Sequence, residues 1–427
     1  MDYGISNSSY EISTYTNPNG KPQSPLLMDP SFQIGQGSFS KVYKSSYTNK
    51  NGEICTVAVK KIPMLPLGEG FPISAVRELY VLNSFHHPNL ISLLDVFIIH
   101  PKGGKGNKGH VDLIFEYMEH DIGALVDNHI SFSLEEIKNI MFQILTGINY
   151  LHSNLILHRD IKSANILLNH DGVVKIGDFG LSRRISKKPF WLPPKMYTNN
   201  VVTLWYRAPE LLLGDKNYTS KIDMWSIGCV FAELLMGTPI FKGSNERSQL
   251  NEILKIIGTP DRDKWYDMVS LPLFNEYLPK NEYDNTLNQL VQSKRNEIID
   301  DDTFDLLKQL LTIHPSQRIN VEDALAHAYF KNGTGCKVRK IEKEYHNFKI
   351  DNENKTHFRF DKDEDMIIGQ KNKYENKLYY KRDAINSGKI IKIQENYDKN
   401  LIDKNQIMYD EAKDKSLLNT IQSIFKK

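Results

Sequence analysis

The spacing of apolar residues changes along the chain from a strand-like to a helical pattern. Runs rich in β-branched and aromatic residues, bounded by Gly, Asn and Pro, occupy Ser31–Lys44, Ile54–Ile62 and Val111–Tyr117 and predict β-strands. After Asp121 the apolar residues recur at intervals of three and four, which predicts helices. This order predicts an α+β protein in which a small β-rich part precedes a larger helical part.

Two helices can be placed from their sequence signals. Ser133 is the expected N-cap of the first, and Glu136 three residues later completes a capping box. The buried stripe of this helix is expected to comprise Ile137, Met141, Ile144, Leu145, Ile148 and Leu151. A second helix is predicted over Ile73–Phe85, where Glu78 lies on or beside an apolar face.

Both ends of the chain differ from this central region. Residues 1–26 are rich in Ser, Thr, Asn, Tyr and Pro and are expected to form a flexible arm. From residue 331 onward there are 22 basic and 16 acidic side chains, and few sustained apolar stripes. Residues 333–427 are therefore expected to be a charged, weakly structured tail. Helical spacing over Ser416–Phe425 is the exception, and it fits either a docking helix or a frayed one.

Composition and charge narrow the class of protein. The 427 residues allow two or three compact units, and 54 Lys and Arg residues nearly balance 52 Asp and Glu residues. This balance gives no reason to expect nucleic acid or a membrane as the main partner. Cys55, Cys229 and Cys336 lie too far apart for a disulfide framework or a CxxC metal site. Without an apolar run of about 18 residues, a soluble intracellular protein is expected.

Two features of the β-rich part are candidates for binding a polyphosphate. Gly35 and Gly37 lie in the run Ile34–Val42 between two predicted strands, where glycines let backbone amides approach a ligand. The run also fits a plain hairpin. Lys60 lies in an apolar strand and so needs a carboxylate partner, for which Glu78 is the candidate. The alternative is two charges that never meet.

A third cluster follows the first long helix. Asp160 and Lys162 precede Asn165, and a predicted hairpin with its turn at residues 169–172 then leads to Asp178. Asn165 and Asp178 fall at the same open end of that hairpin, within reach across adjacent strands. Oxygen ligands beside an acid and two bases suit a magnesium ion that holds phosphate oxygens. Polar loop residues that cap turns remain the alternative.

The order of these motifs resembles that of the eukaryotic protein kinases. It runs from the Gly-rich loop through the strand lysine and the helix glutamate to HRDxKxxN and DFG. The resemblance covers about residues 26–332. It implies a kinase domain over 27–332, bilobal, with a β-rich N-lobe at about 27–117 and a helical C-lobe at about 119–332.

The resemblance also implies roles in phosphoryl transfer, where catalysis is mainly positioning and electrostatic stabilisation. Lys60 holds the α- and β-phosphates of ATP and is itself held by Glu78. Asp160 orients the acceptor hydroxyl and takes its proton, while Lys162 contacts the γ-phosphate. The nucleotide is expected to lie against Ile34, Gly35, Gln36, Gly37, Val42, Ala58, Lys60, Phe115, Glu116 and Met118.

Further roles follow from the same resemblance. Asn165 and Asp178 are the expected ligands of Mg²⁺. Glu210, in Ala-Pro-Glu, resembles the end of an activation segment with Arg318 as its buried ion-pair partner. Asp223 resembles the helix aspartate that anchors the catalytic loop.

Within the kinases, Gly70–Glu78 resembles the PSTAIRE-type helix of cyclin-dependent kinases, which implies a cyclin partner. Thr198 is the implied activating phosphosite, modified by the protein itself or by an activating kinase. A phosphate there adds about −1.5 to −2 of charge and requires guanidinium partners. Those expected are Arg77, Arg159 and Arg183.

The substrate follows from two resemblances. Val201, Val202 and Arg207 match the lining that prefers Ser or Thr followed by proline. Glu116–Asp121 resembles the same segment of the transcription-associated members, which phosphorylate the repeats of RNA polymerase II. This resemblance implies a nuclear location. Phe39 stands where cell-cycle members carry an inhibitory tyrosine. A cell-cycle kinase and a cytoplasmic location stay as alternatives.

Two other classes of protein are alternatives to an active kinase. An inactive scaffold is suggested only by Ser40, which replaces the third glycine of the loop. A nucleic-acid binding tail is disfavoured by its mixed charges. An active cyclin-dependent Ser/Thr kinase is therefore the main expectation.

Overall fold

The computed structural model describes most of the central region of the chain. The described residues are 26–27, 32–36, 40–49, 51–63, 72–99, 109–185, 202–260, 268–277 and 281–346. Among them, no helix combines the length and the apolar character needed to cross a membrane. The predicted helix at Ser416–Phe425 lies outside the described residues.

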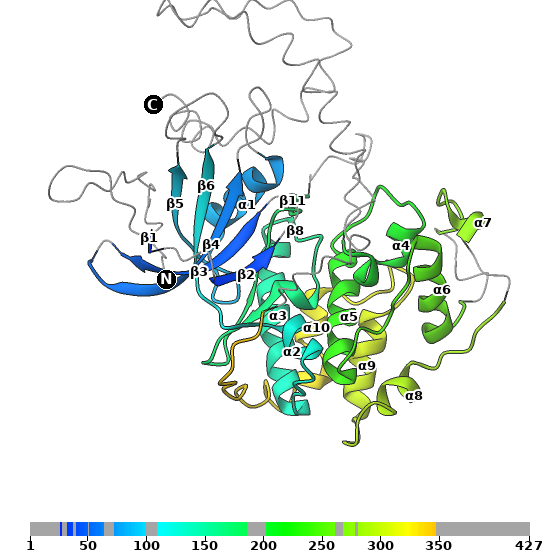
Figure 1. The fold of residues 1–427 in the computed structure, drawn as a ribbon. Helices are drawn as coiled ribbons and strands as arrows, with labels where there is room; N and C mark the ends of the chain where they lie inside the picture. Colours follow the sequence, from blue (N-terminus) through cyan, green and yellow to red (C-terminus); the bar gives the residue numbers. More distant parts are fainter. Residues whose placement is uncertain are drawn as a thin grey trace, which may run out of the picture. The chain divides into compact units, whose positions relative to one another are not determined.

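The first part of the described chain is a β-sheet with one helix beside it (Figure 1). The strands are β1 (Leu26–Leu27), β2 (Gln33–Gln36), β3 (Lys41–Thr48), β4 (Ile54–Pro63), β5 (Leu93–Ile99) and β6 (His110–Glu116). Their order is β1-β3-β4-β6-β5, with β2 paired to β3, and all pairings are antiparallel.

The predicted strands are present with small shifts. The run predicted over Ser31–Lys44 divides into β2 and β3, which pair as a hairpin. The predictions for β4 and β6 are correct to within one residue at each end. Strand β5 was not predicted, because its apolar run LLDVFII lacks a clear alternation.

Helix α1 (Ile73–Ser84) matches the prediction for that segment. Its Ala75 and Leu82 are buried in the same apolar cluster as Leu113 of β6. Glu78 is only 3% exposed, so the helix carries a carboxylate into the interior on its sheet-facing side. The buried acid requires a partner.

The second part of the chain is mainly helical (Figure 1). Its helices are α2 (Ile122–Asp127), α3 (Leu134–Ser153), α4 (Pro209–Leu212), α5 (Lys221–Met236), α6 (Glu246–Ile257), α7 (Phe274–Tyr277), α8 (Leu287–Gln292), α9 (Asp301–Leu310) and α10 (Val321–Leu325). The predicted fold, with a β-rich small lobe followed by a helical large lobe, is confirmed.

Helices α3 and α5 form the interior of the large lobe. The capping box of α3 is confirmed, because Ser133 and Glu136 exchange both hydrogen bonds, and its predicted stripe is fully buried. Helix α5 lies beside α3 and α9 and is buried on all sides from Ile222 to Leu235. A helix in this position provides a fixed base for the loops around it.

The second part of the chain also contains short strands, which form two small sheets apart from the six-stranded sheet. The predicted hairpin is formed by β9 (Ile166–Leu168) and β10 (Val174–Ile176), and β7 (His120–Asp121) pairs with β9. Strand β8 (Ile156–Leu157) pairs with β11 (Arg183–Arg184). The segments before and after the hairpin thus leave it at the same end.

Residues 333–346, at the start of the predicted tail, pack against both lobes. Val338 is 1% exposed, and Arg339 contacts Glu136 of α3 through its backbone and its side chain. Glu344 forms an ion pair with Lys44 of β3 at 2.6 Å and accepts a hydrogen bond from Tyr117. Residues 347–427 lie outside the described residues.

Candidate functional site

Lys60 is the meeting point of three elements. Its Nζ lies 2.8 Å from both carboxylate oxygens of Glu78 on α1 and 3.2 Å from Oδ1 of Asp178, which follows β10. The structure thus brings the strand lysine and the helix glutamate together. The alternative in which these two charges never meet is wrong.

The charges of this group act on one another, and burial, with the nearby Asp178 carboxylate, raises the pKa of Glu78 despite the Lys60 ammonium. Burial opposes the charge of Lys60, but the carboxylates of Asp178 and Glu78 outweigh it and raise the lysine pKa. The Lys60 ammonium in turn lowers the pKa of Asp178 to about 2, against the effect of burial. At neutral pH the group therefore presents one cation between two acids, of which Asp178 is fully ionised.

The predicted nucleotide contacts share one face of the small-lobe sheet. Val42 is opposite Lys60, and Ala58 is opposite Phe115. Because strand residues alternate between faces, these four side chains project to the same side. Ile34, Gly35 and Gln36 lie on β2, next to Val42 in the register, whereas Gly37 lies outside the described residues.

The predicted hinge follows β6. The Glu116 carboxylate accepts the Ser92 amide at 2.7 Å and pairs with Lys175 at 2.9 Å. Met118 is 4% exposed. The carboxylate is thus already engaged within the protein.

Asp160 is surrounded by polar partners. Lys162 Nζ lies 2.9 Å from its Oδ2, and the Asn165 side-chain amide donates to its carbonyl at 2.8 Å and to Oδ2 at 3.2 Å. Thr203 donates both its backbone amide and its hydroxyl to Oδ1, at 3.1 and 3.0 Å. The sequence pattern did not reveal Thr203, because its partner lies 43 positions away in the chain.

The loop that carries Asp160 is fixed by a helix of the interior. Asp223, in the first turn of α5, accepts the backbone amides of His158 and Arg159 at 3.0 and 2.9 Å. These contacts agree with the role that the resemblance implies for Asp223, which is to anchor this loop. Arg159 and Asp178 adopt positive φ values of 66° and 59°. Such strained backbone persists only where its surroundings hold it.

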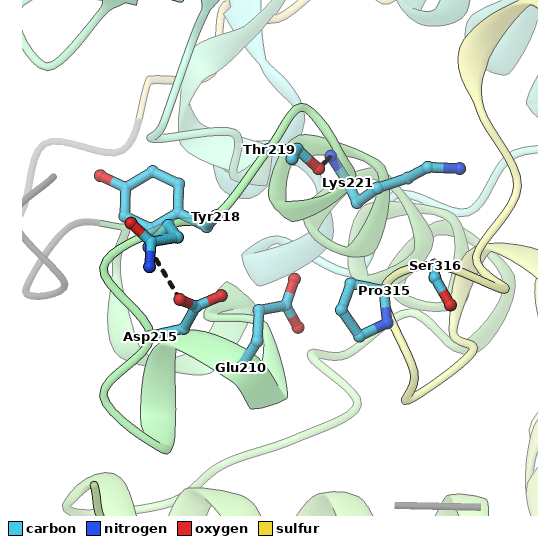
Figure 2. A pocket seen from close by; sticks show the side chains of 8 residues that line it. Glu210, Asp215, Tyr218, Thr219, Lys221, Pro315 and Ser316 are labelled. Atoms are coloured by element: carbon cyan, nitrogen blue, oxygen red, sulfur yellow. Dashed lines mark hydrogen bonds between the residues drawn. The ribbon is translucent and has the colours of Figure 1, made fainter. Parts of the chain in front are cut away.

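The predicted ion pair of Glu210 and Arg318 is confirmed. Two parallel contacts of 2.7 and 2.9 Å join the groups, which are 2% and 0% exposed. Figure 2 shows the Glu210 carboxylate among the residues that line a cavity, with Asp215, Tyr218 and Pro315. The cavity has a volume of about 230 Å³. The pair therefore holds α4, at the end of the segment that begins at residue 202, against Arg318.

The segment before Glu210 holds a strained valine. Val202 has a φ of 70°, rare for a β-branched residue. Arg207 donates from Nε and Nη2 to the Val202 carbonyl oxygen at 3.2 and 3.1 Å. Val201, the other predicted lining residue, lies outside the described residues.

The predicted phosphosite Thr198 also lies outside the described residues. Its three expected arginines are described, on α1 for Arg77, before Asp160 for Arg159 and on β11 for Arg183. Arg159 is 1% exposed and donates to the Leu181 carbonyl and to the Tyr218 hydroxyl. Its buried guanidinium is thus held by neutral acceptors.

Taken together, the group around Lys60 and the group around Asp160 are neighbours, because the charge of Lys162 interacts with those of Asp160, Asp178 and Lys60. Such groups can hold a polyphosphate and accept a proton from a hydroxyl.

Comparison with known proteins agrees with this arrangement. The sequence model of the protein kinase domain matches residues 29–330. The chain is 42% identical to Cyclin-dependent kinase C-2 of Oryza sativa subsp. japonica and 41% identical to Cyclin-dependent kinase C-1 of Arabidopsis thaliana, each over 308 residues. These matches cover 70% of this chain and 58% of each relative. The chain thus spans little more than half the length of these plant proteins.

One solved structure is matched over a larger share of its own length than the plant relatives are. The crystal structure of the yeast RNA Pol II CTD kinase CTDK-1 complex has a TM-score of 0.64 and 36% identity, over 75% of this chain and 97% of that chain. Cyclin-dependent kinase 11B of Mus musculus is 39% identical over 305 residues, which cover 70% of this chain and 36% of that protein. The chain therefore belongs to the protein kinase family, and within that family it is similar to the cyclin-dependent kinases.

Proposed function

We propose that this protein is a cyclin-activated protein kinase that transfers the γ-phosphate of ATP to Ser or Thr followed by proline. The observation that carries the proposal is the contact of Lys60 with both Glu78 and Asp178. A protein kinase needs the strand lysine, the helix glutamate and the DFG aspartate assembled at the same time. ATP is the phosphate donor that a protein kinase domain implies.

Asn165 and Asp178 are the proposed ligands of Mg²⁺. The Asn165 amide nitrogen donates to Asp160, which leaves its Oδ1 as a cation ligand, and Asp178 is ionised at neutral pH. Hard oxygen ligands of this kind suit magnesium. When bound, the ion neutralises charge on the phosphate oxygens.

Asp160 is the proposed acceptor of the substrate hydroxyl proton. Thr203 and Asn165 orient its carboxylate from two sides, and Lys162 offsets its charge. Lys162 is also close enough to contact a transferred phosphate bound beside Asp160. A carboxylate held by this many donors is set in one orientation, and orientation is a large part of catalysis in phosphoryl transfer.

The preference for proline is proposed from Val202. Arg207 binds its carbonyl oxygen, so this oxygen is not available to an amide of a bound peptide. A substrate residue whose N–H must leave water without finding an acceptor loses binding energy. Proline has no N–H and avoids that loss.

A cyclin is the proposed partner, and Thr198 the proposed activating phosphosite. Pro72 gives α1 no side-chain cap, and the helix has no acid in its first turn, so its own end contributes little to its stability. An outside surface that holds α1 would therefore favour the inward position of Glu78. Arg77, Arg159 and Arg183 are the proposed partners of the phosphate.

The transcription-associated branch is proposed from its relatives. The solved relative is a complex described as an RNA Pol II CTD kinase, and the plant relatives carry the name Cyclin-dependent kinase C. We therefore favour the RNA polymerase II C-terminal domain as substrate and the nucleus as location. A cell-cycle kinase is the second candidate. The predicted domain boundaries, 27–332, are supported by the family match over 29–330.

The test is phosphorylation by the full chain purified with its cyclin. Peptides with Ser-Pro repeats should be labelled, and Asp160→Asn should reduce the rate at least about 1,000-fold because the acceptor is no longer oriented or deprotonated. Asp171→Asn, on the exposed hairpin turn, is the matched control and should leave the rate unchanged. Equal labelling by Asp160→Asn would contradict the proposal. Magnesium-dependent ATP consumption separates the enzyme from an inactive scaffold.

A further inference from the structure

Arg207 connects Val202 to a helix of the large lobe. Its Nε and Nη2 donate to the Val202 carbonyl oxygen, while its Nη1 lies 2.6 Å from Oε1 of Glu246, the first residue of α6. The two side chains are 13% and 31% exposed. The guanidinium thus bonds one carbonyl oxygen and one carboxylate.

The carboxylate end of this connection is rigid. Asn245 and Ser248 form a capping box at the start of α6. The fully buried Gln249 accepts the Gly243 amide at 2.7 Å and donates to the Trp205 carbonyl at 3.1 Å. Trp205 returns a hydrogen bond to the Gly243 carbonyl at 3.0 Å. The first turn of α6 is therefore tied to the residues that follow Val202.

The valine end stores strain. A β-branched residue at a φ of 70° is a genuine outlier, and such backbone persists only where its neighbours hold it. Arg207 supplies the holding contacts. A guanidinium with only the carbonyl as partner can rotate away, whereas one fixed at the other end by a carboxylate cannot do so without breaking a charged contact.

We propose that Glu246 is a specificity-determining residue that positions Arg207 and thereby maintains the preference for proline after the phosphoacceptor. This inference rests on the proposed function. Without the carboxylate, Arg207 loses its charged anchor and Val202 relaxes toward negative φ. The Val202 carbonyl then becomes available to the N–H of a non-proline residue, so peptides without proline become better substrates.

The experiment compares kcat/KM for Ser-Pro and Ser-Ala versions of one peptide, with the full chain and its cyclin. Glu246→Ala should lower the Ser-Pro to Ser-Ala ratio about tenfold, because it removes the charged contact. Glu246→Gln, which keeps a neutral acceptor, should give an intermediate ratio. The change should come from a gain on Ser-Ala and a higher KM on Ser-Pro, with kcat for Ser-Pro within about twofold of the parent.

Glu252→Gln is the matched control on the same helix. Glu252 pairs with Lys255 at 2.8 Å in solvent, away from Arg207, and its loss should leave the peptide ratio unchanged. Glu246 is partly exposed, so its variants are expected to fold, and a thermal melt of each checks this.

Two failures are distinguishable. If the parent protein phosphorylates neither peptide, or labels both equally, the proposed function fails. If the parent prefers Ser-Pro and both folded Glu246 variants keep that ratio, the proposed function stands and the role of Glu246 is wrong.

Discussion

The carboxylate of Asp223 accepts the backbone amide of Arg159 at 2.9 Å, and this contact joins the buried helix α5 to the loop before Asp160. The same carboxylate accepts the amide of His158 and lies 2.9 Å from His152 Nε2. Arg159 has a positive φ of 66°. The strained loop is thus held by a buried group.

Asp223→Asn should lower both stability and turnover. The asparagine NH₂ cannot accept an amide hydrogen, so one of the two loop amides loses its acceptor at a cost of about 1–3 kcal/mol. We expect kcat for a Ser-Pro peptide to fall at least about tenfold as the loop loses its geometry. Asp302→Asn is the control, because Asp302 is also in the first turn of a helix but is exposed. Equal effects of both variants would contradict the anchoring role.

The buried pair of Glu210 and Arg318 should behave as a unit. Arg318→Met leaves the Glu210 carboxylate buried and unpaired, and we expect a loss of about 3–5 kcal/mol in the free energy of unfolding. The double variant with Glu210→Leu has no unpaired buried charge and should recover part of that loss. Denaturant unfolding of the parent, the single variants and the double variant measures the coupling. Additive losses would show that the two groups act independently.

Glu233 should make stability depend on pH. Burial raises its pKa from 4.5 to about 7, although the hydroxyls of Tyr206 and Ser163 donate to it. Between these values the folded state holds a proton that the unfolded state has lost. The free energy of unfolding should therefore fall as pH rises from about 4.5 to 7, by up to about 3 kcal/mol.

Glu233→Gln removes the titrating group and should lack this contribution. Unfolding of the parent and the variant at intervals from about pH 5 to pH 8 measures the difference. The two curves should separate progressively across that range. Parallel curves would mean that Glu233 keeps an ordinary pKa in the folded protein.

Residues 333–346 should detach when one glycine is replaced. Gly335 has a φ of 79°, and a Cβ there would overlap the Glu135 carbonyl oxygen. Gly333 has a φ of 102° but faces open space, so Gly333→Ala controls for backbone strain alone. We expect Gly335→Ala to cost about 1–3 kcal/mol more than its control.

Limited proteolysis reports where that loss occurs. Cleavage within residues 333–346 should become faster in Gly335→Ala than in Gly333→Ala, because the segment loses its contact with α3. An unchanged cleavage pattern in both variants would show that this segment is held by its other contacts, such as that of Arg339 with Glu136.

Local patterns were enough to place much of this fold. The capping box at Ser133 and Glu136, the apolar stripe of α3 and the hairpin turn before Val174 each depend on neighbours within a few residues. Their interactions are set by backbone geometry that any such sequence shares. The sequence pattern does not predict strand β5, because a short apolar run fits a strand or a buried helix equally well.

The sequence by itself determined which chemical groups are present and in what order. It also indicated that Lys60, in an apolar strand, needs an acidic partner. Only the tertiary structure decided that this acid is Glu78, that Thr203 orients Asp160, and that Glu246 holds Arg207. The partners in these pairs are 18 to 43 positions apart. Contacts at such separations form because apolar packing brings whole elements together, and this packing leaves no local signal in the residues that meet.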